Sequence, residues 1–297
     1  MACFRPLEAW RDDFGRIRFD GRASDRPLQL PRGRCIGCRQ VRQRSWALRC
    51  LHEARTSPAS CFVTLTYDDK HVPRSLRYVD FQDFMHRVRA EWRRIHDFKT
   101  GPSVRFFVCG EYGELNWRPH FHALLFGWRP SDGVRIGERI FQSRVLDRLW
   151  SMGYASFGSV EYDSAAYCAG YVLKKVTGPK AAAHYERADF ETGEIYRLEP
   201  EFARMSLKPG LGSAWFKKYW RDVYLTRDGV CLPGGKVVPA PRYYDNLLAR
   251  EEPWRASDVE VSRFERSKEF ASELESDRLA VREACAIARS KLKERYL

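Results

Sequence analysis

The pattern of apolar and polar positions predicts alternating strands and helices between residues 39 and 176. Residues 61–67 (CFVTLTY) are β-branched and aromatic, which predicts a strand whose Thr64 and Thr66 share one face. Residues 78–97 place apolar side chains at intervals of three and four, as one buried stripe of a helix does. The other expected elements are helices at 39–56, 138–151 and 164–176 and strands at 104–111, 119–126 and 154–160.

The order of these elements indicates the fold class. It reads β-α-β-β-α-β-α, which is typical of an α+β, ferredoxin-like (RRM-like) antiparallel sheet with helices packed on one face. The connection between the strands at 104–111 and 119–126 is short, so this pair is expected to form an antiparallel hairpin. Residues 1–33 carry scattered Pro, Gly and Arg and are expected to be irregular.

The chain is expected to divide into four segments. A short aromatic-basic helix is expected within 207–220, an extended stretch at 235–244, and charged amphipathic helices from 257 onward. The segments are an irregular N-terminal stretch (1–30), a main domain (31–180), an extension packed on that domain (181–255) and a charged helical tail (256–297).

The charge is strongly and unevenly basic. The chain has 52 Lys and Arg against 39 Asp and Glu, a net charge of +13, and from residue 256 onward the two signs balance at nine each. All of the excess therefore lies on residues 1–255, which favours a polyanion such as nucleic acid as partner over a merely soluble basic surface. Candidate backbone contacts are Arg39, Arg42 and Arg49, with Trp46 as a stacking surface for unpaired bases, although a helical Trp is more often core.

Cysteine content and hydropathy indicate the compartment. Nine cysteines over 297 residues is an odd and sparse set, which favours a reduced cytosol over a disulfide framework. The longest apolar run falls far short of 18 residues, and the N-terminus lacks the apolar stretch of a secretory signal, so neither a membrane span nor secretion is expected. Cys35 and Cys38 form a C-x-x-C, which is half of a zinc site; a turn leading into the basic helix is the preferred interpretation.

A histidine pair carries the sharpest chemical signal. His120 and His122 lie in RPHFHALLFG and are separated by one residue, so on a strand both imidazoles project from the same face. Imidazoles that converge in this way suit a divalent metal, although the spacing is common. Glu111 ends the partner strand of the expected hairpin, and two imidazoles with one carboxylate leave metal positions open for substrate. The competing interpretation of Glu111 is a solvated loop acid.

Two tyrosines and a lysine form a second constellation. Tyr167, Tyr171 and Lys174 fall at i, i+4 and i+7, on one stripe of the helix expected at 164–176. Taken alone, half-buried packing tyrosines are the more ordinary interpretation. Beside a metal that polarises a phosphodiester, however, a phenol is a competent nucleophile, and a neighbouring Lys lowers its pKa or donates to the phosphate. Together with the histidine pair, these residues predict attack on DNA phosphorus and a phosphotyrosine bond.

Several blocks of the sequence together resemble a known family. The chain is similar to the replication initiation proteins of gokushovirus-like microviruses, within the wider HUH endonuclease family of two-tyrosine type. The resemblance spans residues 35 to about 220 in the family's order, and the combination is more specific than any one block. The matching blocks are CIGCRQVRQRSWALRCLHEA (35–54), FVTLTYDD (62–69), CGEYGELNWRPHFHALLFG (109–127), AAYCAGYVLKKVTG (165–178) and FARMSLKPGLG (202–212).

The resemblance assigns roles to individual residues. It implies Mg²⁺ or Mn²⁺ on His120 and His122, with Glu111 as the acidic third ligand. Tyr171 and Lys174 match the family's Tyr-x-x-Lys motif, and the remaining tyrosine of the stripe matches the extra upstream tyrosine. Some relatives carry Lys three residues after each tyrosine, whereas here Gly170 follows the upstream one at that spacing. Equal roles for the two phenols are therefore in doubt, and Tyr171 is the better-supported nucleophile.

The resemblance also implies the biological role. The main domain would be an HUH nuclease that nicks one strand of replicative double-stranded DNA at an origin, keeps the 5′ end on tyrosine and later rejoins the strand to release a circle. Host helicase and polymerase would be the partners, in the cytoplasm of a bacterial host, and Arg118 and Lys175 would be further DNA contacts. The alternatives are a conjugative relaxase, an HUH transposase, or a non-catalytic nucleic-acid-binding module on the same sheet.

Overall fold

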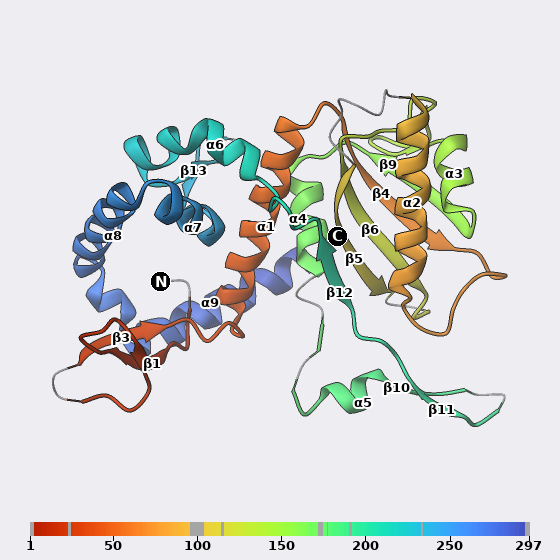
Figure 1. Cartoon of the computed structure of the whole chain (residues 1–297). Coiled ribbons are helices and arrows are strands. Elements are labelled where there is room, and N and C mark those ends of the chain that lie inside the picture. The colour runs from red at the N-terminus through yellow and green to blue at the C-terminus, as the bar shows by residue number, and fades with distance from the viewer. Residues whose placement is uncertain are drawn as a thin grey trace. The chain divides into compact units, whose positions relative to one another are not determined.

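A computed structural model shows the chain as two compact units (Figure 1). Unit 1 comprises Met1–Arg44 and Asp245–Leu297, and unit 2 comprises Ser45–Tyr244. Among the described residues, no helix has the length and apolarity that crossing a membrane requires. The described residues are 3–22, 25–95, 104–113, 116–171, 175–176, 178–189, 192–232 and 234–294.

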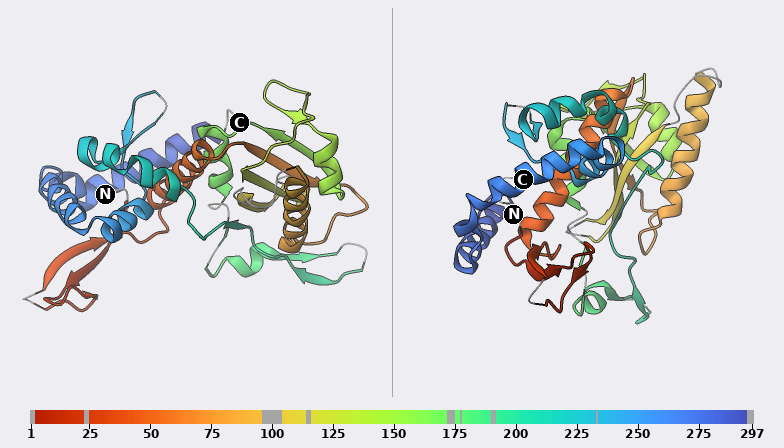
Figure 2. Two further views of the ribbon diagram at one scale, coloured as in Figure 1. Left: turned by 45° about the horizontal axis from the view of Figure 1, so that its top comes forward. Right: turned by 60° about the vertical axis from the view of Figure 1, so that its left-hand side comes forward.

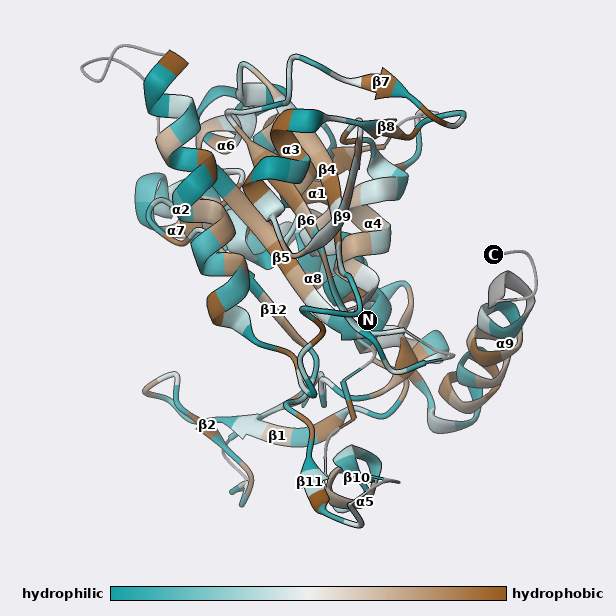
Figure 3. Cartoon of the chain, turned by 90° about the vertical axis from the view of Figure 1, so that its right-hand side faces the viewer, coloured by the Kyte–Doolittle hydropathy of each residue, from teal (hydrophilic) through white to brown (hydrophobic). Residues whose placement is uncertain are grey.

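The main sheet of unit 2 has seven strands in the spatial order β12-β5-β6-β4-β9-β8-β7. Every pair of neighbours is antiparallel. The central strands are rich in β-branched and aromatic residues, and Figure 3 shows hydrophobic residues along them. The strands are β4 (Ser60–Tyr67), β5 (Arg105–Tyr112), β6 (Pro119–Phe126), β7 (Val134–Arg135), β8 (Phe141–Gln142), β9 (Gly153–Gly158) and β12 (Phe202–Met205).

The middle of this sheet is ferredoxin-like, as the sequence predicts. The chain order β4-α2-β5-β6-α3-β9 is β-α-β-β-α-β, and the four strands lie side by side as β5-β6-β4-β9. The hairpin of β5 and β6 is antiparallel, also as predicted. The α+β fold class is therefore confirmed.

Helices pack on the sheet from two sides. The helices α2 (Tyr78–Ile95) and α3 (Arg144–Trp150) cover the predicted face, where Phe81, Phe84 and Trp150 are fully buried (Figures 1 and 2). The structure adds a second core on the opposite face, which the sequence pattern does not reveal. There α1 (Ile36–Thr56) contributes the part that lies in unit 2, and α4 (Tyr162–Tyr171) packs beside it. This second face carries the site described below.

The remaining elements of unit 2 follow α4 in the chain. Two of its small sheets pair antiparallel neighbours, β10 with β11 and β13 with β14. The elements are α5 (Ala181–Tyr185), β10 (Glu186–Ala188), β11 (Ile195–Arg197), α6 (Ser213–Arg221), the π-helix η1 (Asp222–Arg227), β13 (Val230–Cys231) and β14 (Val237–Val238). A further helix, α7 (Arg242–Glu251), begins in unit 2 and ends in unit 1.

Unit 1 contains a sheet where irregular chain is expected. The prediction for residues 1–33 is wrong: β1 (Leu7–Arg11) pairs antiparallel with β2 (Ile17–Arg18) and with β3 (Arg26–Leu30). These strands are short and mostly exposed, so they lack the buried alternation by which strands are recognised in a sequence. The helices predicted from residue 257 onward are confirmed in kind, as α8 (Pro253–Lys268), the 3-10 turn η2 (Ala271–Leu274) and α9 (Ser276–Glu294).

Two expected boundaries differ from the structure. The helix predicted over 138–151 begins only at Arg144, because Ser143 caps it by accepting a hydrogen bond from the N–H of Leu146. The residues just before that cap form β8 instead. The stretch expected to be extended at 235–244 contains the two residues of β14 and then enters α7.

Candidate metal centre

Strand register brings the predicted metal ligands together. In the β5–β6 hairpin, Glu111 lies directly opposite His120. On the other side of β6, His120 pairs with Thr66 and His122 pairs with Thr64 of β4. Directly opposed residues in an antiparallel pair project from the same face, so Glu111, both imidazoles and both threonines share one surface. The expectation that the hairpin carries Glu111 to the histidine pair is a matter of geometry, and the structure shows it.

The three side chains converge on one carboxylate oxygen. Oε1 of Glu111 lies 2.7 Å from Nε2 of His120 and 3.1 Å from Nε2 of His122. One ligand atom from each of the three residues lies within 4.8 Å of the others. Glu111 and His122 are buried, while His120 is partly open to solvent. A small ion among these atoms would therefore meet protein on one side and solvent on the other.

A second layer of contacts orients the two rings. Nδ1 of His122 lies 3.0 Å from Oγ1 of Thr64, and Nδ1 of His120 lies 3.1 Å from the carbonyl oxygen of Arg118. A carbonyl only accepts, so His120 must donate its Nδ1–H there, and its Nε2 is the atom left to face Glu111. Hydrogen bonds of this kind fix ring orientation in histidine metal ligands. The predicted ligands are thus held with both Nε2 atoms aimed at the same point.

The charge state of the carboxylate suits a cation. Burial by itself raises the pKa of Glu111, but hydrogen bonds from His120 and His122 and their charge outweigh it and hold the pKa at about 2. Glu111 is therefore ionised at any physiological pH. Two imidazole nitrogens and one carboxylate oxygen form a mixed donor set that is compatible with a divalent metal ion.

One predicted tyrosine lies against this cluster. The ring of Tyr167 on α4 stands edge-on to the imidazole of His122 with 5.3 Å between centroids, and edge-on to Phe62 at 6.2 Å. Beneath it, Cys168 is fully buried with its Sγ 3.5 Å from Sγ of Cys109, which fastens α4 to the sheet. Tyr167 itself is 44% exposed, so its phenol is accessible to a large substrate.

The other members of the tyrosine stripe are described only in part. Tyr171 is the last residue of α4, one helical turn beyond Tyr167, and its side chain lies outside the described residues. Lys174 also lies outside them. Their catalytic roles remain predictions, whereas the backbone shows that both tyrosines are carried by the helix that packs beside the histidines.

The predicted DNA contacts fall into two groups. Arg39, Arg42 and Lys175 are exposed, as a contact to DNA requires. Arg49 and Arg118, in contrast, are engaged within the protein. Nε of Arg49 donates to the carbonyl of Leu211 at 3.0 Å, and its guanidinium stacks on the rings of Trp46 and Tyr243 at 4.1 and 4.0 Å.

Arg118 and Trp46 are used in a similar way. Nη1 of Arg118 donates to the carbonyl of Tyr67 at 2.8 Å, and its Nη2 binds Asp69, which fastens the end of β4 to the start of β6. The ring of Trp46 lies 5.3 Å from that of Phe107, at the edge of the second core. These contacts stabilise the scaffold of the site, and they were not expected from the sequence.

One aromatic side chain on the site's face was missed by sequence reasoning. Tyr154 of β9 pairs with Thr66 across the sheet, in the same row as His120 and Glu111, and it is 70% exposed. An exposed Tyr on a sheet face is a platform on which a base can stack. The alternation of β9 would have shown the orientation of Tyr154, but only the register with β4 shows that it shares the row of the metal ligands.

Comparisons with known proteins agree with this site. A family model of replication-associated proteins of the ORF2 type matches residues 60–176, from β4 to just past α4. The chain is 33% identical to "Replication-associated protein VP4" of Bdellovibrio phage phiMH2K over 282 residues, 91% of this chain and 84% of the relative. It is 28% identical to "Replication-associated protein ORF2" of Spiroplasma virus 4, covering 84% of this chain and 81% of the relative.

A third relative is shared in part. "Replication-associated protein ORF4" of Chlamydia phage 1 is 28% identical over 232 residues, which are 74% of this chain and 54% of the relative. No solved structure matches the chain. The chain belongs to the replication-associated protein family of these small phages, and the resemblance to microvirus initiators is confirmed.

Proposed function

We propose that this protein initiates rolling-circle replication by nicking one DNA strand at an origin through metal-assisted tyrosine transesterification. The observation that carries the proposal is the position of Tyr167, edge-on to His122 and beside the Glu111–His120 pair, on a chain whose relatives are replication-associated proteins. A nucleophile, a set of metal ligands and an open sheet face in one place supply what phosphodiester transfer requires.

The reaction exchanges one phosphodiester for another. The phenolic oxygen attacks phosphorus, a bond from tyrosine oxygen to phosphorus forms, and the bond from phosphorus to the 3′ oxygen breaks. The proton that leaves the phenol ends on the departing 3′ oxygen, so the products are a 5′-phosphotyrosine and a free 3′-hydroxyl. Because the bond energy is retained, the reverse step rejoins the strand, which releases a circular genome after a round of synthesis.

The three ligands prepare the phosphate for this attack. We propose Mg²⁺ or Mn²⁺ as the ion held by Glu111, His120 and His122; when bound, it withdraws charge from the non-bridging oxygens. The protein's own residues set the rest of the geometry. Thr64 and the Arg118 carbonyl fix the imidazoles, and the packing of Cys168 on Cys109 fixes the helix that carries the tyrosines.

The two tyrosines would act in succession. Tyr167 is beside the ligands, and Tyr171 follows on the same stripe with Lys174 as its proposed assistant. We propose that one phenol nicks and the other cuts again after displacement of a genome length. Tyr171 is the better match to the Tyr-x-x-Lys motif, while Tyr167 has the shown contact with the histidines.

The DNA partners follow from the exposed surface. We propose that single-stranded origin DNA lies over the row of Tyr154 and His120, and that Arg39, Arg42 and Lys175 contact phosphates. The 3′-hydroxyl would then serve a host polymerase, with a host helicase opening the duplex, in the cytoplasm of the infected bacterium. The exposed arginines and lysine are single changes that DNA affinity would report.

A covalent-adduct assay tests the proposal. Single-stranded oligonucleotides that tile the phage genome, labelled at the 3′ end, are incubated with the protein and Mn²⁺ and separated on a denaturing gel. We expect one sequence to give a slow band of protein joined to DNA. The variant Tyr167→Phe/Tyr171→Phe should lose the band, as should His120→Ala, and each single tyrosine variant should show which phenol acts first.

The matched control is Tyr196→Phe, which removes a phenol from the β10–β11 hairpin, away from the site. It should form adduct at the wild-type rate. An adduct that survives loss of both site tyrosines would contradict the proposal. DNA binding without any adduct, unaffected by a chelator, would instead indicate a non-catalytic binding module.

A further inference from the structure

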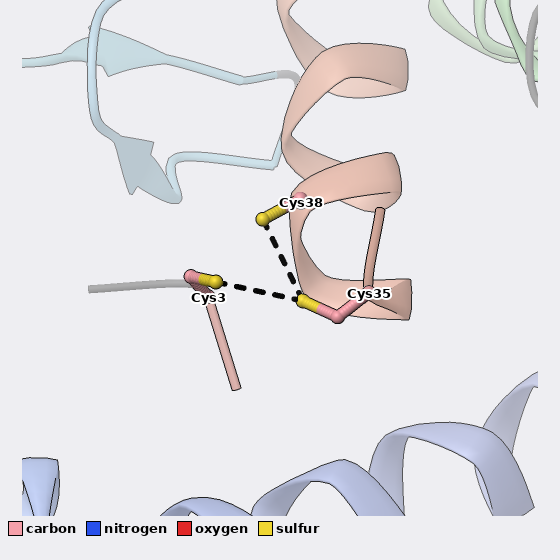
Figure 4. Close-up of side chains that lie close together, drawn as sticks. All are labelled: Cys3, Cys35 and Cys38. Atoms are coloured by element: carbon pink, nitrogen blue, oxygen red, sulfur yellow. Dashed lines mark hydrogen bonds between the residues drawn. The ribbon is translucent and has the colours of Figure 1, made fainter. Parts of the chain in front are cut away.

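A cluster of three cysteines lies far from the histidines in the sequence. Cys3, which precedes β1, meets Cys35 and Cys38 at the start of α1 (Figure 4). All three belong to unit 1. Cys3 and Cys35 are buried at 1% and 6% exposure, and Cys38 is partly buried. The C-x-x-C seen in the sequence thus has a third member, contributed from 32 residues upstream.

The spacing of the sulfur atoms fits one tetrahedral ion. Sγ of Cys35 lies 3.8 Å from Sγ of Cys3 and 3.5 Å from Sγ of Cys38. Zinc–thiolate bonds of about 2.3 Å at tetrahedral angles place neighbouring sulfurs about 3.8 Å apart. Thiolates of an iron–sulfur cluster bind different iron atoms and lie farther apart, so the spacing favours a single ion.

The surroundings of the sulfurs suit thiolates. The backbone N–H of Phe4 donates to Sγ of Cys35 at 3.3 Å, and that of Arg32 donates to Sγ of Cys3 at 3.4 Å. Cys35 and Cys38 sit at the N-terminus of the 21-residue α1, whose unpaired N–H groups and dipole stabilise negative charge. These contacts offset part of the charge that three thiolates bring to one point.

We propose that Cys3, Cys35 and Cys38 bind one zinc ion that fastens the N-terminal segment to the start of α1. Soft thiolates select zinc over Mg²⁺ and Mn²⁺, so this site and the Glu111–His site take different metals. Residues 1–44 and 245–297 contain no histidine, so the fourth zinc position takes water or a small added ligand rather than an imidazole of unit 1. The ion stabilises a unit whose N-terminal strands bury little apolar surface.

Metal content tests the proposal without any DNA. Protein from zinc-supplemented cells is purified with a reductant and dialysed against Mg²⁺, and zinc is measured per chain. We expect about one zinc per chain, retained in the His120→Ala/His122→Ala variant. Cys3→Ser, Cys35→Ser and Cys38→Ser should each lower the zinc affinity at least tenfold. Cys285→Ser, which alters an exposed cysteine of α9, should leave it unchanged.

Spectroscopy on the wild-type chain keeps the test valid where a cysteine variant misfolds. Cobalt added to zinc-stripped protein should give thiolate-to-cobalt charge transfer and tetrahedral d–d absorption, and zinc should abolish both. A chain without this absorption, or with zinc unchanged by Cys35→Ser, would overturn the proposal, as would a Cys35–Cys38 disulfide found by alkylation and mass spectrometry under the same reducing conditions. Because the readout is metal and not cleavage, failure of the proposed nicking leaves this result untouched.

Discussion

The histidine pair depends on two hydrogen bonds that the motif itself does not contain. His122 faces Thr64 and His120 faces the carbonyl of Arg118, and both contacts use Nδ1. A neutral imidazole has one N–H, so a partner at Nδ1 leaves the lone pair on Nε2. The site is therefore set at the level of single atoms, by residues that would not be counted among its ligands.

The hydroxyl of Thr64 gives the first prediction. Thr64→Val keeps the side-chain shape and the β-branched preference for a strand, but it removes the oxygen that contacts Nδ1 of His122. We expect Mn²⁺ affinity to fall about tenfold or more, as loss of a ligand-orienting partner does. Titration followed by electron paramagnetic resonance measures it. Thr226→Val, an exposed change on η1, should bind Mn²⁺ as wild type does, and equal affinity in both variants would contradict the role of Thr64.

A buried histidine away from the site gives a prediction about acid. His52 is 1% exposed, stacks on Trp215 at 3.5 Å and contacts the hydroxyl of Tyr244 at 2.8 Å. Burial lowers the pKa of His52 to about 3, assisted by the charge of Arg55. Between about pH 6.5 and pH 3 the unfolded chain therefore binds a proton at His52 that the folded chain does not, so stability falls as the pH falls.

The effect of His52 is measurable by denaturant unfolding across that range. The free energy of unfolding should gain up to about 1.4 kcal/mol per pH unit from this group as the pH rises from 4 to 6. His52→Gln, which has no titrating ring, should flatten the dependence although it is less stable. His86→Gln, an exposed change on α2, should keep the wild-type slope. An unaltered slope in His52→Gln would show that His52 is not the source.

At the scale of elements, the register and the packing of one helix assemble the site. The pairing of Glu111 with His120 follows from the tight β5–β6 hairpin, and a shift by one residue would turn Glu111 to the opposite face. The position of Tyr167 follows from α4, which rests on the sheet through small residues. These are Ala165, Cys168 and Ala169, all fully buried.

The close approach of α4 gives a prediction at this scale. Cys168→Leu adds volume where Sγ of Cys168 already lies 3.5 Å from Sγ of Cys109 and 3.4 Å from the carbonyl of His122. Overpacking of this kind costs about 1–3 kcal/mol and shifts the helix. We expect adduct formation to fall about tenfold or more, because misplacement of about 1 Å has that effect on rate, while Mn²⁺ affinity stays near wild type.

The control for this change is Cys231→Leu, the same substitution at an exposed cysteine of β13. It should form adduct normally. If Cys168→Leu lost metal affinity and adduct to the same degree, the helix would be acting through the histidines rather than through the placement of its tyrosines.

At the scale of the whole molecule, charge is separated along the chain. Residues 256–297 are neutral overall, so the net charge of +13 comes from the rest of the sequence. Exposed arginines on the first half of α1 belong to that basic part, whereas α9 is a mixture of both signs. Each phosphate that a protein neutralises releases counterions, so the salt dependence of binding counts the charges involved.

This separation predicts which arginines affect DNA binding. Fluorescence anisotropy of a labelled single strand, measured across NaCl concentrations, should show affinity falling steeply with salt. Arg39→Ala/Arg42→Ala should lower the slope of log affinity against log salt by about two, one for each phosphate contact. Arg289→Ala/Lys291→Ala removes the same charge from the neutral tail and should leave the slope unchanged. Equal effects of the two pairs would mean that only total charge matters.

Particular residues show how far the sequence carried. The alternation in β4 and the stripe of α2 predicted both elements, because burial of one face imposes its period on the chain. Arg49 and Arg118 were expected on DNA, since an Arg in a basic segment has no local sign of an internal partner. The carbonyl of Leu211 that binds Arg49 is 162 positions away, and no spacing rule reaches that far.

The sequence by itself determined the fold class, the histidine pair on one strand face and the tyrosine stripe on a helix, because these follow from periods of 2 and 3.6 within single elements. Only the tertiary structure decided that Glu111 shares its oxygen with both imidazoles, that Tyr167 stands beside them, and that Cys3 completes the Cys35–Cys38 pair. The reason is physical: contacts between elements depend on strand register, helix packing and closure of long loops, and these are set by the whole core rather than by neighbours in the chain.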